Sequence, residues 1–188
     1  MIQETRFPLN FIQTITKNHL LLFYDSVDYA REIQCQFLKE GLKKNEICYF
    51  VTSEIKDVEN ELKKNGIDIE SDEIKKQFKI INIKDSKNDV SGILKNSQEK
   101  ITQVPIRIVG DKVLFSNDTD DLKLGFDFER HLHELFPNFN GNILCSYHVS
   151  SINEQKRSEI VDFLFSHHHS VMFAPENNKG TSFYLNNN

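Results

Sequence analysis

The chain has 188 residues and a formal net charge of −5, with 38% hydrophobic and 27% charged residues. A chain of this length buries enough surface to fold as one domain without disulfides. The acidic excess argues against a general nucleic-acid or anionic-membrane surface, because no net positive field holds a polyanion, and leaves only a local basic patch open. No apolar run approaches the ~20 residues that cross a bilayer, and the polar start at residues 1–6 excludes a signal peptide. We therefore expect a soluble cytoplasmic protein.

Short apolar runs alternate with longer amphipathic stretches along the chain. The first run, residues 19–24, is continuously apolar, as is typical of a strand that is covered on both faces. Further strands are predicted at residues 47–52, 78–83, 106–110, 142–149 and 170–174. Helical spacing of apolar residues predicts helices at 27–44, 54–64, 86–103, 118–136 and 153–167.

This alternation predicts an α/β fold in three layers, with helices on both faces of a mostly parallel sheet. The turn cluster at residues 175–180 precedes a short run, Thr181 to Leu185, which is expected to pair antiparallel with the last strand at the edge of the sheet. Residues 1–17 are interpreted as a lead-in segment, 18–185 as a single domain and 186–188 as a disordered tail.

Ligands of open α/β sheets bind outside the carboxyl ends of the strands. That rule selects strand-end residues, namely Tyr24, Asp25, Ser26, Thr52, Ser53, Gly110, Asp111, Tyr147 and His148. The first strand-to-helix turn, residues 24–28, contains neither glycine nor lysine and carries two carboxylates where a bound phosphate would lie. Nucleotide hydrolysis through a Walker-type loop is therefore excluded.

Several polar residues have two interpretations at this point. Asp25 and Asp28 either stabilise the start of a helix or contact a ligand as well. Asp111 is either a turn residue at a strand end or a site residue. Arg107 lies inside an apolar strand, so if it is buried it needs a partner, either Asp111 or an acid on a neighbouring strand. On an edge strand it would need none.

The cysteines and histidines do not indicate a catalytic or metal site. Three widely spaced cysteines, with no CxxC pair, exclude both a disulfide framework and a zinc site. His131 and His133 are two apart on a helix and cannot share one face, and residues 167–169 close a helix, where histidines suit the last turn. Cys145 and Tyr147 alternate along a strand and point to the same face. We predict no catalytic residue, no metal and no cofactor.

Ordered motifs along most of the chain resemble one known family. They are His19-Leu20-Leu21-Leu22-Phe23-Tyr24, Phe37-Leu38-Lys39-Glu40-Gly41-Leu42, Asn45-Glu46-Ile47-Cys48-Tyr49-Phe50-Val51-Thr52, Leu62-Lys63-Lys64-Asn65-Gly66-Ile67-Asp68, Ile106-Arg107-Ile108-Val109-Gly110-Asp111 and Leu144-Cys145-Ser146-Tyr147. The sequence resembles the MEDS family, a sensory domain described in methanogen and methylotroph proteins and in a regulator of dichloromethane catabolism.

The resemblance implies a RecA-like or KaiC-like fold without a working phosphate loop, which senses small organic molecules such as hydrocarbon derivatives. Family members are fused to histidine kinases or DNA-binding domains, or occur alone as signalling partners. The positions characteristic of the family, together with strand-end residues, give the expected ligand-binding residues. These are His19, Tyr24, Asp25, Thr52, Arg107, Asp111, Cys145 and Tyr147.

Three functions follow as hypotheses. The first is a non-catalytic sensory domain that binds a small organic ligand in a crevice between Tyr24, Asp111 and Tyr147, and signals to a partner protein or to a second copy. The second is a structural or docking module with a vestigial RecA-like pocket. The third is a hydrolase-type enzyme with chemistry that the motifs do not reveal.

Overall fold

The computed structural model describes residues 7–82, 92, 104–111, 119–176 and 179–185. Seven strands form one sheet in the order β3-β2-β4-β5-β1-β6-β7. All neighbouring strands are parallel except β6 and β7, which are antiparallel. The strands are β1 (Asn18–Tyr24), β2 (Ile47–Thr52), β3 (Phe78–Asn82), β4 (Ile106–Asp111), β5 (Gly141–His148), β6 (Ser170–Ala174) and β7 (Thr181–Tyr184).

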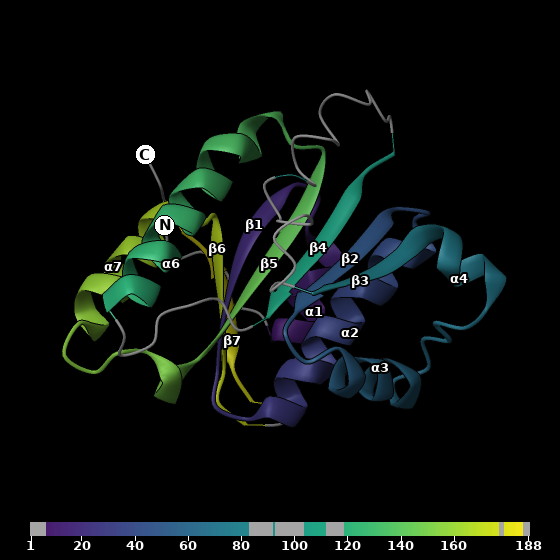
Figure 1. Cartoon of the computed structure of the whole chain (residues 1–188), viewed down its shortest axis with the longest axis horizontal. Coiled ribbons are helices and arrows are strands. Elements are labelled where there is room, and N and C mark those ends of the chain that lie inside the picture. Colours follow the sequence, from purple (N-terminus) through teal and green to yellow (C-terminus); the bar gives the residue numbers. More distant parts are fainter. Residues whose placement is uncertain (1–6, 83–91, 93–103, 112–118, 177–178, 186–188) are drawn as a thin grey trace.

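Helices cover both faces of this sheet (Figure 1). The helices are α1 (Pro8–Thr14), α2 (Val27–Lys43), α3 (Ile55–Lys64), α4 (Asp72–Gln77), α6 (Thr119–Leu135) and α7 (Arg157–His167). Helices α1, α2 and α3 pack on one face and share one hydrophobic core with it. Helices α6 and α7 pack on the other face, over a second core. The three-layer, mostly parallel α/β fold and its antiparallel C-terminal strand are thereby confirmed.

Strand β1 lies between β5 and β6, and every one of its residues is buried. Because side chains alternate along a strand, Leu20 and Leu22 enter the core beneath α2, whereas Leu21 and Phe23 enter the core beneath α6 and α7. The continuous apolar run is therefore explained by a helical layer on each side.

Several boundaries differ from the sequence-based expectations. Helix α7 begins at Arg157 rather than at residue 153, because the Asn153 side chain accepts a hydrogen bond from the Lys156 backbone and forms a turn first. Helix α3 begins at Ile55, after Thr52 Oγ1 has accepted a hydrogen bond from the Glu54 backbone. The lead-in contains the unpredicted helix α1, and α4 is also unpredicted. The expected helix at 86–103, apart from residue 92, and the tail at 186–188 lie outside the described residues.

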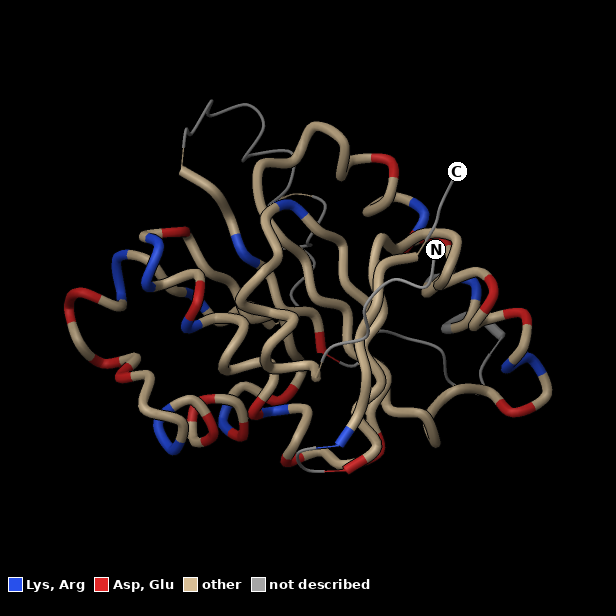
Figure 2. Tube along the Cα trace, turned by 180° about the vertical axis from the view of Figure 1, so that it is seen from behind, with Lys and Arg blue, Asp and Glu red and all other residues tan. Residues whose placement is uncertain are grey.

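Charged residues of both signs alternate along the helices and their connections, whereas the strands are almost free of them (Figure 2). No helix in the described part of the chain is long and apolar enough to cross a membrane. Neither observation singles out a surface of one charge as an interaction site.

Candidate functional site

The expected ligand-binding residues lie on both faces of the sheet. Tyr24 belongs to the core beneath α2, and Arg107 and Asp111 contact residues of that helix. Thr52 shares their face, since it lies two residues beyond Phe50 along β2. His19, Cys145 and Tyr147 face α6 and α7 instead, and Asp25 is exposed at the end of β1. The sheet thus separates Tyr147 from Tyr24 and Asp111, so these three residues do not line one crevice.

A buried polar cluster, here called the Arg31 cluster, lies beneath α2 at the carboxyl ends of the strands. Arg31 Nη1 forms an ion pair with Asp111 Oδ2 at 2.8 Å and donates to Gln34 Oε1 at 2.8 Å. Gln34 Nε2 in turn donates to Ser146 Oγ at 3.0 Å. Ser146 is the register partner of Asp111 on β5. The cluster therefore connects α2 to two central strands.

Tyr24 is the aromatic neighbour of this cluster. Burial and, to a smaller extent, the Asp111 carboxylate raise the pKa of Tyr24 to about 12, and Arg31 opposes the shift. Its hydroxyl therefore stays neutral near pH 7. The Tyr24 ring also packs edge-on against His148, with 5.2 Å between ring centroids. His148 Nε2 contacts the backbone oxygen of Asp25 at 3.0 Å.

Arg107 lies apart from the Arg31 cluster, near the amino end of β4. Its guanidinium donates from Nε and Nη2 to the two carboxylate oxygens of Glu46, at 2.6 and 3.1 Å, and from Nη1 to the Phe37 carbonyl at 2.9 Å. The required acid thus immediately precedes the neighbouring strand β2. Asp111, the other candidate partner, is paired with Arg31 instead. All of these partners are protein groups. Arg107 therefore links β4 to β2 through Glu46, and to α2 through Phe37.

A second buried cluster, here called the histidine cluster, lies between the sheet and the helices α6 and α7. Four groups from four places in the chain meet here: His19 on β1, Glu129 on α6, Cys145 on β5 and His168 directly after α7. Their side chains are buried, and one potential ligand atom from each lies within 4.8 Å of all the others. Tyr147 donates its hydroxyl hydrogen to Glu129 Oε1. The cluster lies away from the carboxyl ends of the strands, where the sequence predicted the ligand site.

Burial favours the neutral form of each group in the histidine cluster. It raises the pKa of Glu129 to about 7, against the hydrogen bonds from Tyr147 and Cys145 that lower it. Burial also lowers the pKa of His168 to about 3 and that of His19 well below its ordinary value, and raises the pKa of the Cys145 thiol well above its usual range. His19 Nε2 lies 3.4 Å from Cys145 Sγ, but the pair is not an activated thiolate–imidazolium pair.

Sequence reasoning missed Arg31, Gln34 and Ser146 of the first cluster, and Glu129 and His168 of the second. Both charged residues carry a signal that would have found them, because they fall on the buried faces of amphipathic helices. Glu129 follows Leu122 by seven residues and precedes Leu132 by three, and all three are buried. A charge at such a position needs partners in the protein. Only tertiary contacts reveal His168, because it lies in a run of three histidines.

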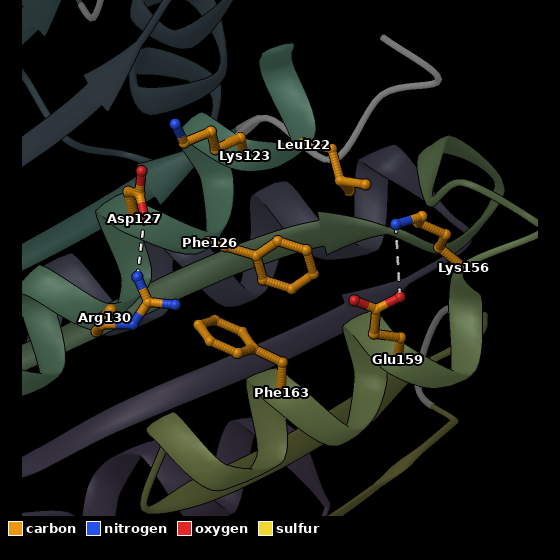
Figure 3. Close-up of a pocket in the computed structure, with 8 residues that line it drawn as sticks. All are labelled: Leu122, Lys123, Phe126, Asp127, Arg130, Lys156, Glu159 and Phe163. Atoms are coloured by element: carbon orange, nitrogen blue, oxygen red, sulfur yellow. Dashed lines mark hydrogen bonds and ion pairs between the residues drawn. The ribbon is translucent and has the colours of Figure 1, made fainter. Parts of the chain in front are cut away.

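A surface pocket of about 390 Å³ opens between α6 and α7. We call it the α6–α7 pocket. Its lining consists of Leu122, Lys123, Phe126, Asp127, Arg130, Lys156, Glu159 and Phe163. The rings of Phe126 and Phe163 meet edge to face at its centre, with 4.6 Å between centroids (Figure 3). Asp127 with Arg130, and Lys156 with Glu159, form ion pairs at 2.8 and 3.6 Å around them. None of the expected ligand-binding residues lines this pocket.

The chain belongs to the MEDS family, the MEthanogen/methylotroph, DcmR Sensory domain, whose model matches residues 18–168. The match contains all four residues of the histidine cluster and the whole α6–α7 pocket. No curated protein matches the chain by sequence.

Solved structures with the same fold have low sequence identity to this chain. A protein from Pyrococcus horikoshii OT3 has a TM-score of 0.59 and 12% identity, covering 89% of this chain and 87% of that one. A KaiC-like protein from the same hyperthermophilic archaeon has a TM-score of 0.58 and 16% identity, with coverages of 89% and 76%. The RadB recombinase has a TM-score of 0.54 and 12% identity, with coverages of 87% and 78%. These similarities show a RecA/KaiC-like fold.

Proposed function

We propose that this MEDS chain is a non-catalytic sensory domain that binds a small organic molecule in the α6–α7 pocket and signals to a partner protein. Membership of a sensory family supports the role in sensing. The observation that carries the proposal is the pocket itself. Its volume of about 390 Å³ falls within the ~300–1,000 Å³ typical of small-molecule sites. Its two helices follow central strands of the sheet, α6 after β4 and α7 after β5.

The lining of the pocket indicates the chemistry of the ligand. Phe126, Phe163 and Leu122 provide an apolar surface, and charged side chains surround it. This combination suits a mostly apolar molecule with one polar group. Burial of ~200 Å² of apolar ligand surface would contribute ~5 kcal/mol before the costs of association are subtracted. We therefore expect micromolar affinity or weaker.

The turn between β1 and α2 supports a role without nucleotide hydrolysis. A phosphate-binding loop needs free backbone N–H groups at a helix N-terminus. Here Ser26 Oγ accepts the Tyr29 N–H at 3.3 Å, so a side chain already uses one of these donors. Asp25 and Asp28 add negative charge at the same place. The fold is RecA/KaiC-like, but this turn disfavours a bound phosphate.

Tyr24 and Asp111 remain the alternative ligand contacts. They lie beneath α2, at the carboxyl ends of the central strands β1 and β4. Their surroundings support this alternative less well, because Asp111 already pairs with the buried Arg31. The two locations lie on opposite faces of the sheet. Substitutions can therefore test them separately.

The chain has no tryptophan, so a Phe163→Trp variant would carry a single fluorescent reporter inside the α6–α7 pocket. We would titrate it with short alcohols and haloalkanes, using dichloromethane as the first probe. A saturable change in emission is expected, and Phe126→Ala in the same background should weaken binding by about tenfold or more, since it removes the apolar partner of the reporter. Tyr184→Trp, on the partly exposed last strand, reports non-specific effects.

The outcomes separate the hypotheses. Saturable binding that Phe126→Ala weakens and Tyr24→Phe leaves unchanged supports the α6–α7 pocket. If only Tyr24→Phe weakens binding, the ligand lies at the carboxyl ends of β1 and β4. That result would contradict the α6–α7 pocket. If no probe of the panel binds, the proposal fails in favour of a docking module.

A further inference from the structure

We propose that His19, Glu129, Cys145 and His168 together bind one divalent transition-metal ion, with Zn²⁺ as the best match. The observation behind this proposal is the convergence of two imidazoles, a carboxylate and a thiol in one buried place, from β1, α6, β5 and the end of α7. The site is independent of the α6–α7 pocket, since it shares no residue with the lining of that pocket.

The spacing of the four groups fits tetrahedral coordination. With metal–nitrogen and metal–oxygen bonds of about 2.0–2.2 Å and a metal–sulfur bond of about 2.3 Å, neighbouring ligand atoms lie ~3.3–3.6 Å apart. His19 Nε2 lies 3.4 Å from Cys145 Sγ and 3.8 Å from Glu129 Oε2. His168 Nε2 lies 3.5 Å from Glu129 Oε2. Since no pair is separated by more than 4.8 Å, small side-chain movements complete the shell.

A hydrogen bond outside the cluster orients the His168 ring for metal binding. His168 Nδ1 contacts the Leu164 carbonyl oxygen at 2.8 Å. A carbonyl can only accept, so Nδ1 carries the hydrogen and Nε2 of the neutral ring carries a lone pair. That lone pair faces Glu129 Oε2. Two acceptors at this distance repel unless a cation or a proton lies between them.

The outer shell resembles that of known metal sites. Metal-binding histidines usually donate their second ring N–H to a carbonyl or carboxylate, and metal-binding carboxylates are themselves hydrogen-bonded. The His168 ring bonds the backbone of Leu164, and Glu129 accepts from Tyr147. These two ligands thus have supporting partners within the protein.

The donor set indicates both the metal and its role. One thiolate, two imidazoles and one carboxylate suit Zn²⁺ and similar borderline metals rather than Mg²⁺ or Ca²⁺. A divalent ion with one thiolate, one carboxylate and two neutral imidazoles gives a site of zero net charge, which favours its burial in an apolar core. Four protein ligands leave no coordination position for substrate, which is typical of structural sites. The ion would join the sheet to both helices of that layer.

The experiment uses the full chain, purified and then unfolded and refolded with Zn²⁺ or Co²⁺. Elemental analysis should find one tightly bound ion per chain. Co²⁺ should give the visible d–d bands of a tetrahedral site and a thiolate-to-cobalt charge-transfer band. A chelator present during refolding should lower the melting temperature, because a metal that binds only the folded state stabilises it by mass action.

Two single substitutions and two matched controls test the assignment. Cys145→Ala should abolish the charge-transfer band, and Glu129→Gln should weaken metal binding by more than ~100-fold, exceeding the typical effect of an outer-shell partner. Cys35→Ala removes another buried cysteine, and His167→Ala removes a neighbouring ring that could bind metal adventitiously. Both controls should keep the full stoichiometry and the cobalt spectrum.

The result that would overturn the proposal is a wild-type protein that refolds, as judged by circular dichroism, without stoichiometric metal at micromolar Zn²⁺. A proton shared by Glu129 then explains the cluster. Metal that is lost in His167→Ala but kept in Cys145→Ala and Glu129→Gln also overturns it, in favour of adventitious binding at residues 167–169. If a cluster variant does not fold, the cobalt spectrum of Cys35→Ala still decides whether Cys145 is a ligand. In this variant Cys48 is the only thiol besides Cys145, and it lies in the opposite core. A thiolate-to-cobalt band that persists therefore comes from Cys145.

Discussion

The Arg107 side chain fills the space that a side chain on Gly41 would occupy. A Cβ atom at Gly41 would lie 2.8 Å from Arg107 Cδ and equally close to Cys48 Sγ. The absence of a side chain on this turn of α2 thus makes room for the guanidinium to reach Glu46 and Phe37. A glycine in the interior of a helix lowers helix stability by ~1 kcal/mol relative to alanine. At this position the glycine leaves the space in which the buried ion pair of Arg107 and Glu46 forms.

Gly41→Ala is expected to destabilise the protein, although alanine is the better helix former. Overpacking in a dense core costs ~1–3 kcal/mol, which exceeds the gain in helix propensity. Urea unfolding should show a lower midpoint with an unchanged slope. Lys43→Ala, on the same helix but exposed, should change the unfolding free energy by less than ~0.5 kcal/mol. A Gly41→Ala protein as stable as the wild type would contradict the close packing.

Glu46→Gln is expected to cost ~3–5 kcal/mol, because it leaves the buried Arg107 charge without its counter-charge. The double variant Glu46→Leu, Arg107→Met removes both charges. It should be more stable than Glu46→Gln, since a pair of apolar residues leaves no buried charge unpaired. Chemical denaturation measures both. If the double variant loses as much stability as the sum of the single variants Glu46→Leu and Arg107→Met, the two residues are not coupled.

Tyr24 is expected to make stability fall at alkaline pH. Its pKa rises from 10.0 to about 12 in the folded chain, through burial and the Asp111 carboxylate. The unfolded state therefore loses its proton first, so the stabilisation is fully present below pH 10 and is lost as the pH rises towards 12. The difference in unfolding free energy between the wild type and Tyr24→Phe should shrink across this window. A constant difference would mean that Tyr24 titrates as it does in the unfolded chain.

The thiols of Cys35 and Cys48 should resist modification in the folded protein. Both are buried, and burial raises the pKa of Cys35 to about 11 and that of Cys48 to about 12. Because the thiolate is the reactive form, a disulfide exchange reagent should react at pH 8 only at the rate of unfolding. In denaturant both thiols should react at once. Rapid reaction of either thiol in the native protein would show that the structure around it opens locally, at α2 for Cys35 or at β2 for Cys48.

Local sequence patterns predicted much of the architecture. The continuous apolar run of β1 indicated a strand covered on both faces, and β1 lies between two parallel neighbours. The turn cluster before Thr181 predicted the antiparallel last strand. Helices α1 and α4 were missed, because seven and six residues are too few for a helical period to stand out. Periodicity is a local property, so it serves long elements best.

The sequence by itself determined the succession of the strands and of the longer helices α2, α3, α6 and α7, the acidic turn after β1 and the family of the chain, because each of these leaves a pattern in short stretches of sequence. Only the tertiary structure decided which polar residues meet. His19 and Cys145 are 126 positions apart, and they share a face only because the register aligns Leu21 with Cys145. Glu129 joins them through the packing of α6 on that face. Contacts of this kind depend on strand register and helix docking, which arise from the packing of the whole chain and leave no local pattern.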